Sequence, residues 1–267
     1  MKRLLPDDSW KPSWWYSYPY DLMEIYGDTR ENPGYVYAYR MRRDSTISLI
    51  KSIAKPGDHI LDVAASQGNF TLTLAELGYN VTWNDIREDL AGYVELKRET
   101  GNITYRPGNA FDLKFDRLFD VVLATEIIEH VAHPDEFLAK LATLVKPGGY
   151  VVISTPLGSY FKNDLPKFSD VADPSVFESK QFGPHSEDHI FLLHMDEIAT
   201  LAKKAGLEVM GMKYNTNFFT GGYSKLRPML KWMPKTLILA LERFTQALPQ
   251  SIGKRIHTNF AVLLKKQ

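Results

Sequence analysis

The stretch ILDVAASQGNF, Ile60–Phe70, joins an apolar run, an acidic residue and a turn of small residues. The apolar run ends in Asp62, and a second apolar pattern begins after Gly68. This order is typical of a strand-to-helix turn at which a nucleotide approaches the backbone. Ala64 and Ser66 stand where such turns usually carry glycine. Both are small enough for that approach, provided that the turn needs no positive φ at either position.

Strand and helix patterns alternate outward from this turn, separated by short Gly/Pro turns. The pattern predicts strands at 60–63, 80–84, 103–106, 119–124, 150–154 and 258–264, and helices at 40–53, 70–77, 87–100 and 133–144. A further helix and strand are predicted between 194 and 214. The alternation indicates an α/β fold with a Rossmann-like, doubly wound sheet, mostly parallel with an antiparallel last strand. Such sheets bind ligands at the carboxyl ends of their strands.

The sequence divides into an N-terminal part, 1–54, and a main domain, 55–267. Tryptophan and tyrosine are concentrated between residues 10 and 37, which predicts an aromatic lid over the ligand pocket or, alternatively, packing on the outside of the sheet. The helix that follows carries Arg40, Arg42 and Arg43. These arginines either meet the carboxylate of a cofactor or an anionic acceptor, or they form a solvated helix face.

The composition excludes several classes of function. The chain has 267 residues, 32 basic and 32 acidic side chains and no cysteine. Disulfides, thiolate metal sites and a cysteine nucleophile are therefore excluded, and no global charge favours nucleic acid. The N-terminal MKRLLPDDSW has no apolar signal region, and no run reaches the roughly 20 apolar residues of a membrane span. We expect a cytoplasmic protein, with possible contact to the inner face of a membrane left open.

Asp85 follows the second predicted strand, where a carboxylate can accept hydrogen bonds from two ribose hydroxyls. The glycine pattern is wrong for a dinucleotide, and Asp62 would repel a pyrophosphate. A cofactor that carries a cation would not be repelled. A dehydrogenase is therefore the least favoured reading.

Five segments, HILDVAASQGNFT, VTWNDI, GNAFDL, FDVVLATEIIEHV and LVKPGGYVVISTP, together resemble the class I S-adenosylmethionine-dependent methyltransferases. The resemblance covers residues 55 to 215 and implies S-adenosylmethionine as cofactor. It implies that Asp85 holds the ribose with Ile86 against the adenine. The full set of implied cofactor-binding residues is Asp62, Ala64, Ala65, Ser66, Gly68, Asp85, Ile86, Asn109, Ala110, Phe111 and Thr125. Asn109 stands where the family often has aspartate.

The segment TEIIEHV follows the strand at 119–124 and carries Glu126, Glu129 and His130 at positions i, i+3 and i+4. On a helical turn these side chains share one face, where a divalent cation would offset their mutual repulsion. His189 is the expected fourth ligand; His185 and His194 are alternatives from the same region.

The E-x-x-E-H pattern with a later histidine resembles two branches of the superfamily. These are the small-RNA terminal-ribose 2′-O-methyltransferases, which use Mg²⁺ or Mn²⁺, and the ubiquinone-pathway O-methyltransferases. The resemblance makes Glu126, Glu129, His130 and His189 metal-ligand candidates. A metal-free reading, in which His130 or His189 is the general base, and a purely structural reading remain open.

A basic, apolar insertion at about 221–255 interrupts the last two strands. Leu237, Leu241, Phe244 and Leu248 lie on one helical stripe flanked by basic residues. The stripe fits a peripheral membrane helix or, alternatively, a lid or homodimer helix buried against protein. The sequence thus predicts an O-methyltransferase acting on a hydroxyl of a small molecule, glycan or lipid-linked precursor. The alternatives are an RNA ribose 2′-O-methyltransferase and a catalytically silent binding subunit.

Overall fold

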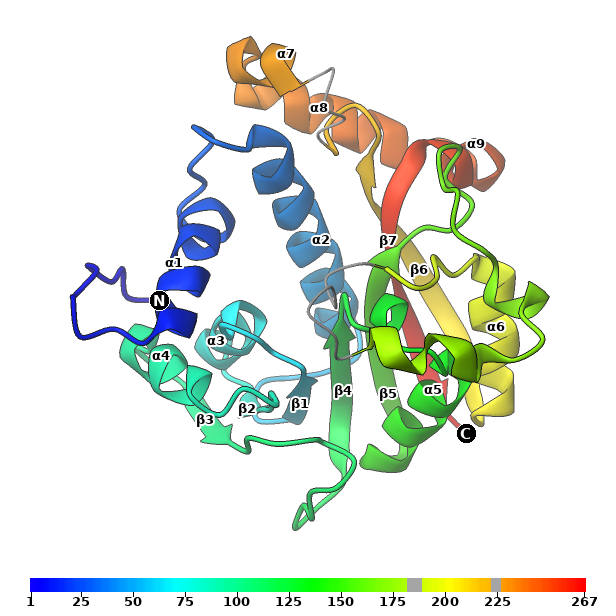
Figure 1. The fold of residues 1–267 in the computed structure, drawn as a ribbon, viewed down its shortest axis with the longest axis horizontal. Helices are drawn as coiled ribbons and strands as arrows, with labels where there is room; N and C mark the ends of the chain where they lie inside the picture. Colours follow the sequence, from blue (N-terminus) through cyan, green and yellow to red (C-terminus); the bar gives the residue numbers. More distant parts are fainter. Residues whose placement is uncertain (182–188, 222–226) are drawn as a thin grey trace.

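A computed structural model describes residues 1–181, 189–221 and 227–267. Its centre is a seven-stranded sheet in the order β3-β2-β1-β4-β5-β7-β6 (Figure 1). The strands are β1 (His59–Val63), β2 (Asn80–Trp83), β3 (Asn102–Tyr105), β4 (Phe119–Thr125), β5 (Val145–Pro156), β6 (Leu207–Asn217) and β7 (His257–Lys266). β7 runs antiparallel to both β5 and β6, whereas the pairs from β3 to β5 are parallel. The predicted fold class is confirmed.

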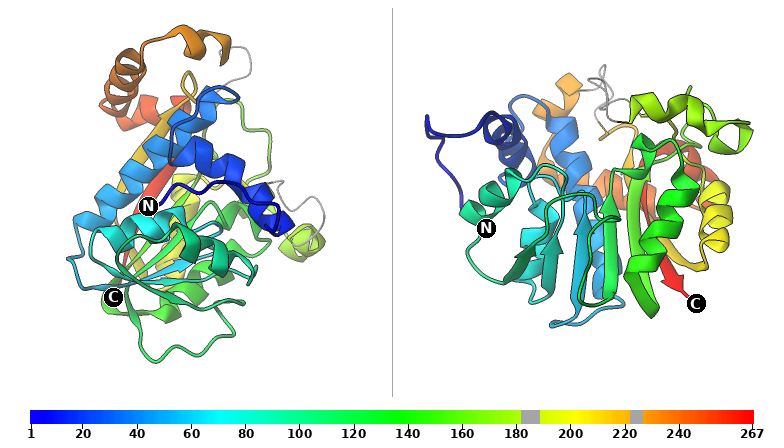
Figure 2. Two further views of the ribbon diagram at one scale, coloured as in Figure 1. Left: turned by 90° about the vertical axis from the view of Figure 1, so that its left-hand side faces the viewer. Right: turned by 60° about the horizontal axis from the view of Figure 1, so that its bottom comes forward.

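Helices cover both faces of the sheet (Figure 2). α2 (Pro33–Lys51) and α3 (Asn69–Glu76) pack on one face, and α5 (Pro134–Leu144) and α6 (Met195–Lys204) pack on the other. Successive side chains of a strand point to opposite faces. Val121 and Leu123 of β4 therefore enter the core under α2 and α3, while Val122 and Ala124 enter the core under α5 and α6. Burial on both faces explains the nearly continuous apolar sequence of this strand.

The aromatic N-terminal segment forms a helix, α1 (Pro12–Glu24), that lies beside α4 (Leu90–Lys97). The rings of Trp10 and Trp14 lie 5.7 and 5.8 Å from the ring of Tyr93 on α4. The indole of Trp14 also donates a hydrogen bond to the carbonyl of Asp89 at 2.9 Å. Trp10 and Trp14 thus pack against α4, and the aromatic lid over the ligand pocket stays a prediction.

Several element boundaries differ from the sequence expectations. α2 begins at Pro33 because Asn32 caps it, accepting a hydrogen bond from the backbone N–H of Tyr35. α4 is shorter than predicted, and β5 already begins at Val145, so that it includes the KPGG segment. The division of the chain at residue 54 stays a prediction, since α2 packs against β5, β6 and β7.

The remaining elements lie in the connections. The described residues include the 3₁₀ helices η1 (Ile128–His130), η2 (Phe168–Asp170) and η3 (Pro174–Lys180). The insertion between β6 and β7 contains α7 (Arg227–Trp232), α8 (Lys235–Gln246) and α9 (Gln250–Ile256). It forms the upper end of the molecule in Figure 1. Within the described residues, no helix is both long and apolar enough to cross a membrane.

Candidate active site

The turn after β1 adopts the left-handed conformation at three positions. The φ angles are 55° at Ala64, 51° at Ser66 and 73° at Gly68. The sequence reading allowed alanine and serine here only if no positive φ was required, and that condition does not hold. Non-glycine residues in this region of φ/ψ space carry local strain. At Gly68, a Cβ atom would come within 2.6 Å of a methyl group of Val94, so that close packing also requires glycine there.

Asp62 is buried at the start of this turn with one oxygen unsatisfied. Its Oδ2 accepts a hydrogen bond from Thr71 at 2.6 Å, whereas its Oδ1 has no partner among the described residues. Burial, with a smaller contribution from the charge of Asp85, raises the pKa of Asp62 to about 7. A cationic group placed at Oδ1 would satisfy the orphaned oxygen and restore the charge. The residue therefore fits a positively charged cofactor.

Asp85 is buried at the end of β2, with its carboxylate already hydrogen-bonded. Oδ2 accepts from the backbone N–H of Ser66 at 2.7 Å, and the backbone and guanidinium of Arg87 donate to Oδ1 at 2.9 and 3.0 Å. The hydrogen bond from Ser66 to Asp85 connects the turn after β1 to the turn after β2, the two turns expected to bind the cofactor. The half-exposed Arg87 side chain covers the carboxylate that the sequence reading assigned to the ribose.

The predicted adenine-side residues lie along the same edge of the sheet. The backbone N–H of Gly108 donates to the carbonyl of Asp85 at 2.9 Å, which brings the segment 108–111 beside the β2 turn. Ile86 is exposed, Ala110 is buried, and Phe111 makes an edge-to-face contact with Phe137. Asn109 is exposed and donates to Asp112 at 2.9 Å. The segment thus lies beside Asp85, and its contact with the adenine stays a prediction.

Two carboxylates of α1 also reach the cofactor turn, and neither is among the residues predicted from the sequence. Glu24 accepts hydrogen bonds from Gln67 at 3.0 Å and from Asn69 at 2.7 Å. Asp21 pairs with the buried ammonium of Lys97 at 2.9 Å and also accepts from Asn69. α1 is therefore docked onto the turn by buried polar contacts. The spacing of Asp21 and Glu24 on one helical face was the only available signal.

Glu129, His130 and His189 form a compact cluster beyond the carboxyl end of β4. One potential ligand atom from each side chain lies within 4.8 Å of the others, and the two imidazole centroids are 5.0 Å apart. Glu129 is completely buried; its Oε2 accepts from Thr155 at 3.0 Å. Its Oε1 has no hydrogen-bond partner in the described structure and lies 4.0 Å from His130 Nε2. Burial, followed by the charge of Glu126, raises the pKa of Glu129.

His189 reaches this cluster through a backbone connection. The N–H of Ile190 donates to the carbonyl of Glu129 at 2.8 Å, and both Ile190 and Phe191 are buried. His194 instead caps the start of α6 and lies outside the cluster, and His185 falls outside the described residues. Of the three histidines considered in the sequence, His189 is the one that the described structure brings to Glu129.

Glu126 does not share a helical face with Glu129 and His130, contrary to the sequence expectation. It follows Thr125, the last residue of β4, with a φ of 52°, and only Ile128–His130 form a helical turn. Its carboxylate accepts from Arg42 and from Asn259 at 2.9 Å, and from Ser154 at the same distance. These partners occupy Glu126 and keep it out of the cluster.

The family model described as "Methyltransferase domain" matches residues 37–210, which include both turns and the cluster. The chain belongs to the class I S-adenosylmethionine-dependent methyltransferases. The unsatisfied Oδ1 of the buried Asp62 fits the positive charge that this cofactor carries.

The relatives include enzymes named for O-methylation. The methyltransferase is 34% identical over 172 residues to the ubiquinone biosynthesis O-methyltransferase of Dechloromonas aromatica (strain RCB), covering 62% of this chain and 72% of that protein. It is 32% identical over 166 residues to the protein of the same name from Bordetella avium (strain 197N), covering 60% of this chain and 67% of that one.

Solved structures with low sequence identity share the fold. Magnesium protoporphyrin IX methyltransferase (ChlM) from Synechocystis PCC 6803 with bound SAH gives a TM-score of 0.57 at 12% identity, covering 93% of this chain and 92% of that chain. The [4+2]-cyclase SpnF gives a TM-score of 0.54 at 13% identity, covering 90% of this chain and 84% of that chain. Since one neighbour is named as a cyclase, the fold alone does not define the reaction.

Proposed function

We propose that this methyltransferase methylates a hydroxyl oxygen of a small molecule, with Glu129, His130 and His189 holding a divalent cation beside the acceptor. The observation that carries the proposal is the unsatisfied Oε1 of the buried Glu129, which lies 4.0 Å from His130 Nε2 in a cluster that includes His189. A buried carboxylate oxygen without a donor is costly, and a bound cation would remove that cost. One carboxylate and two imidazoles suit a divalent transition ion such as Mn²⁺ better than Mg²⁺ alone. The names of the relatives support oxygen as the acceptor atom.

The reaction moves one methyl group and one proton. The new bond joins the methyl carbon to the acceptor oxygen, and the bond from that carbon to sulfur breaks, so that the sulfonium becomes a neutral thioether. The hydroxyl proton passes from the acceptor to solvent water or, where no cation is bound, to His130 or His189. A bound cation would lower the pKa of the hydroxyl and orient it. Asp62 faces the positive part of the cofactor, and the turn that it begins positions the methyl group for in-line transfer.

Arg42 and Glu126 complete the proposed pocket. Their ion pair at 2.9 Å lies between the cofactor turn and the ends of β5 and β7, where Ser154 and Asn259 also bind Glu126. We assign Arg42 to the carboxylate end of the cofactor, with Glu126 setting the orientation of its guanidinium. If no cation binds, His130 or His189 is the base that accepts the hydroxyl proton.

The experiment combines cofactor and metal titrations with an acceptor assay. We expect S-adenosylhomocysteine to bind in calorimetry and Mn²⁺ to produce a separate heat that is lost in Glu129→Gln. Glu136→Gln, at an exposed site on α5, is the matched control and should keep both heats. Methyl transfer to a catechol probe should require the metal. Transfer to the 3′ end of an RNA oligonucleotide but not to catechol would favour the RNA alternative, and no cofactor binding would favour the silent subunit.

We also propose that the insertion meets an anionic membrane surface. Leu237 and Phe244 of the predicted stripe are 48% and 65% exposed, and Trp232 is 89% exposed. Ile238 and Glu242 form the buried side of α8, and Leu241 and Leu248 of the stripe are half-buried, so Leu237 and Phe244 are the part of the stripe that is open to an external surface. Exposed apolar and aromatic side chains flanked by Lys231 and Lys235 suit the interface of a bilayer that contains anionic lipid.

A further inference from the structure

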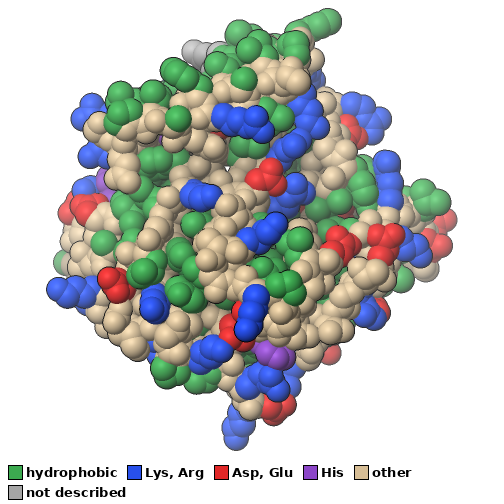
Figure 3. Space-filling view, turned by 180° about the vertical axis from the view of Figure 1, so that it is seen from behind, with side chains coloured by type: hydrophobic (Ala, Val, Ile, Leu, Met, Phe, Trp, Pro, Cys, Tyr) green, Lys and Arg blue, Asp and Glu red, His purple; other side chains and the backbone are tan. Residues whose placement is uncertain are grey.

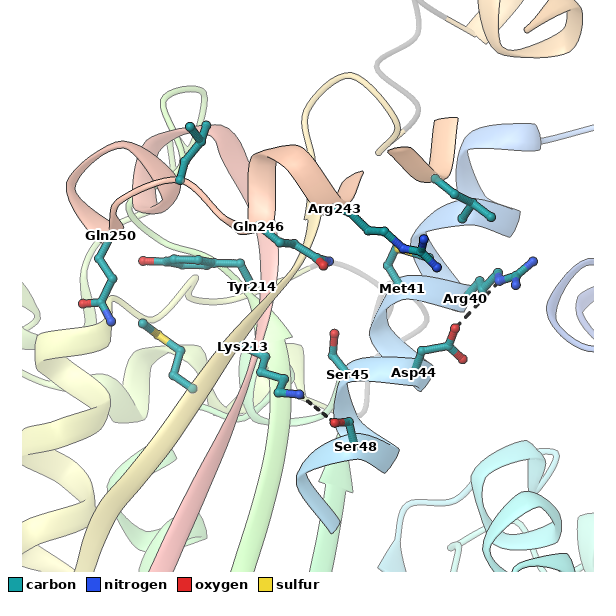
Figure 4. A pocket seen from close by; sticks show the side chains of 13 residues that line it. Arg40, Met41, Asp44, Ser45, Ser48, Lys213, Tyr214, Arg243, Gln246 and Gln250 are labelled. Atoms are coloured by element: carbon teal, nitrogen blue, oxygen red, sulfur yellow. Dashed lines mark hydrogen bonds and ion pairs between the residues drawn. The ribbon is translucent and has the colours of Figure 1, made fainter. Parts of the chain in front are cut away.

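An open cavity is bordered by α2, β6, α8 and α9, and no residue of the cofactor turn lines it. Its volume is about 530 Å³, within the usual range for small-molecule sites. The residues that line it include Arg40 and Asp44 of α2, Lys213 of β6 and Arg243 of α8. Figure 4 shows Arg243 and Gln246 extending from α8 toward α2, with Lys213 below them. Four separate elements therefore contribute to one polar cavity.

The charge of this cavity is predominantly positive. Three cationic side chains line it, Arg40, Lys213 and Arg243, whereas Asp44 is the one acid among the lining residues. The carboxylate of Asp44 is shared between Arg40 at 3.7 Å and Arg43 at 3.0 Å. Seen from behind, the molecule shows basic side chains gathered along the middle of this face (Figure 3). A positive cavity of this kind concentrates anions.

The cations of the cavity retain capacity to donate hydrogen bonds. Lys213 donates to the hydroxyl of Ser48 at 2.6 Å, which directs its ammonium along the wall formed by α2. The Nε of Arg40 is buried without a hydrogen-bond acceptor in the described structure. Neither Lys213 nor Arg243 forms a salt bridge with an acidic side chain within residues 1–181, 189–221 and 227–267. Incompletely paired cations that line one cavity are suited to recognising phosphate.

The wall opposite α2 depends on close helix packing. The ring of Tyr214, which also lines the cavity, stacks on His257 with centroids 4.8 Å apart. α9 approaches this ring at Gly253, where a Cβ atom would lie 2.8 Å from Tyr214. This packing holds α9, and with it Gln250, at the edge of the cavity. The wall of the cavity at α9 is thus fixed by close packing of the insertion against β6.

We propose that this cavity binds the phosphate or diphosphate group of a phosphorylated small molecule. Arg40, Lys213 and Arg243 supply the positive charge, and Ser45, Gln246 and Gln250 supply neutral hydrogen-bonding groups. Arg42, which faces Glu126, lies on a different side of α2 from Arg40, Asp44 and Ser48, which are four residues apart. The site is therefore distinct from the candidate active site and does not depend on methyl transfer.

The test is calorimetric titration of the full chain with inorganic pyrophosphate, and flotation with vesicles that contain phosphatidic acid. We expect saturable pyrophosphate binding that weakens at least tenfold in Arg243→Ala and in Lys213→Ala. Both residues are exposed, so the variants should fold, which the thermal unfolding midpoint checks. Lys203→Ala, at an exposed site on α6, is the control and should bind as wild type does.

The two arms distinguish the source of the phosphate. Pyrophosphate binding that Arg243→Ala weakens assigns the site to a soluble phosphorylated compound. Vesicle binding alone, lost in the same variant, assigns it to a lipid head group. The proposal is overturned if neither probe binds. It is equally overturned if Arg243→Ala and Lys213→Ala bind like wild type, or if Lys203→Ala weakens binding as much as they do.

Discussion

Asp21 and Glu129 are both buried carboxylates near the carboxyl edge of the sheet, but their hydrogen bonding differs. Asp21 accepts from Lys97, Asn69 and Tyr93, the last at 2.7 Å, so that both its oxygens are satisfied. Glu129 has one satisfied oxygen and one that faces two histidines. A complete network stabilises a fold, whereas an incomplete one next to ligand-type side chains indicates a binding site. Burial alone therefore does not distinguish structural from functional acids.

The largest effect should follow from Glu129→Gln. We expect methyl transfer to fall by about 10²- to 10⁴-fold, the range associated with losing a positioned proton-transfer or charge-bearing group. The unfolding midpoint should stay the same or rise, because the amide needs no counter-charge. Steady-state kinetics and thermal unfolding measure the two quantities. Unchanged kcat would contradict the functional assignment of Glu129, and a large loss of stability would make it structural like Asp21.

Asp21→Ala should mainly lower stability, whereas Glu129→Gln should mainly lower activity. Removing one partner leaves the ammonium of Lys97 buried without its counter-charge, which costs roughly 3–5 kcal/mol. Urea unfolding measures this loss, and the double variant Asp21→Ala/Lys97→Met should recover part of it. Asp28→Ala, which removes an exposed ion pair with Arg30, is the control and should change stability little. Recovery by the second substitution is the decisive result, since a purely steric loss would not be reversed.

Glu242 provides a third carboxylate, buried on α8 and held by the backbone N–H of Asn217 at 3.2 Å. Burial raises the pKa of Glu242 to about 8, from an ordinary value of 4.5. Because the folded pKa is raised, its contribution to stability is complete below the unfolded pKa and is lost as the pH rises toward the folded pKa. The free energy of unfolding of wild type should therefore fall by roughly 2 kcal/mol relative to that of Glu242→Gln as the pH rises from about 5.5 to 7.5.

Urea titrations of both proteins at the two pH values measure that difference. The glutamine oxygen can still accept from Asn217, so the variant tests the charge and not the hydrogen bond. A pH-independent difference between the two proteins would mean that Glu242 ionises freely in the folded state. Glu242 would then not be a buried carboxylate of the kind that Asp21 and Glu129 are. The side of α8 that carries it would have to be open to water.

The turn after β1 permits a smaller test of strain. Ala64→Gly should raise the free energy of unfolding by about 0.5–1 kcal/mol, because glycine adopts a positive φ without the steric cost that alanine pays there. The neighbouring Ala65 has no positive φ, so Ala65→Gly should lower stability by a similar amount. Denaturant midpoints measure both. Two changes of the same sign would show that the strain at Ala64 is not what limits stability.

The sequence predicted the features that depend on neighbouring residues. The strands around Ile60 and Val121 follow from continuous apolar runs, and the turn at Gly68 follows from small residues after an acid. The same local pattern could not show that Glu126 would be drawn away from Glu129. Its partners Arg42 and Asn259 are 84 and 133 residues distant along the chain. Only the folded sheet brings such groups together, and the residue roles inferred from the family motif stay predictions.

The smallest expected effect concerns the exposed apolar side chains of the insertion, Trp232 on α7 and Phe244 on α8. Trp232→Ser/Phe244→Ser should reduce sedimentation with vesicles containing phosphatidylglycerol by severalfold, because both side chains are mostly exposed and contribute apolar area only to an external surface. Val176→Ser removes an apolar residue that is as exposed as Phe244 but lies outside the insertion, and it should leave vesicle binding unchanged.

Neutral phosphatidylcholine vesicles separate the contribution of charge from that of apolar area. Lys231 and Lys235 flank the exposed side chains, so wild type should bind neutral vesicles less and should lose binding to anionic ones as salt is added. If wild type instead binds neither lipid and elutes as a dimer that Trp232→Ser/Phe244→Ser dissociates, the stripe is a homodimer interface. In that case the exposed aromatic side chains would still mark a docking surface, but the surrounding lysines would have no role in lipid recognition.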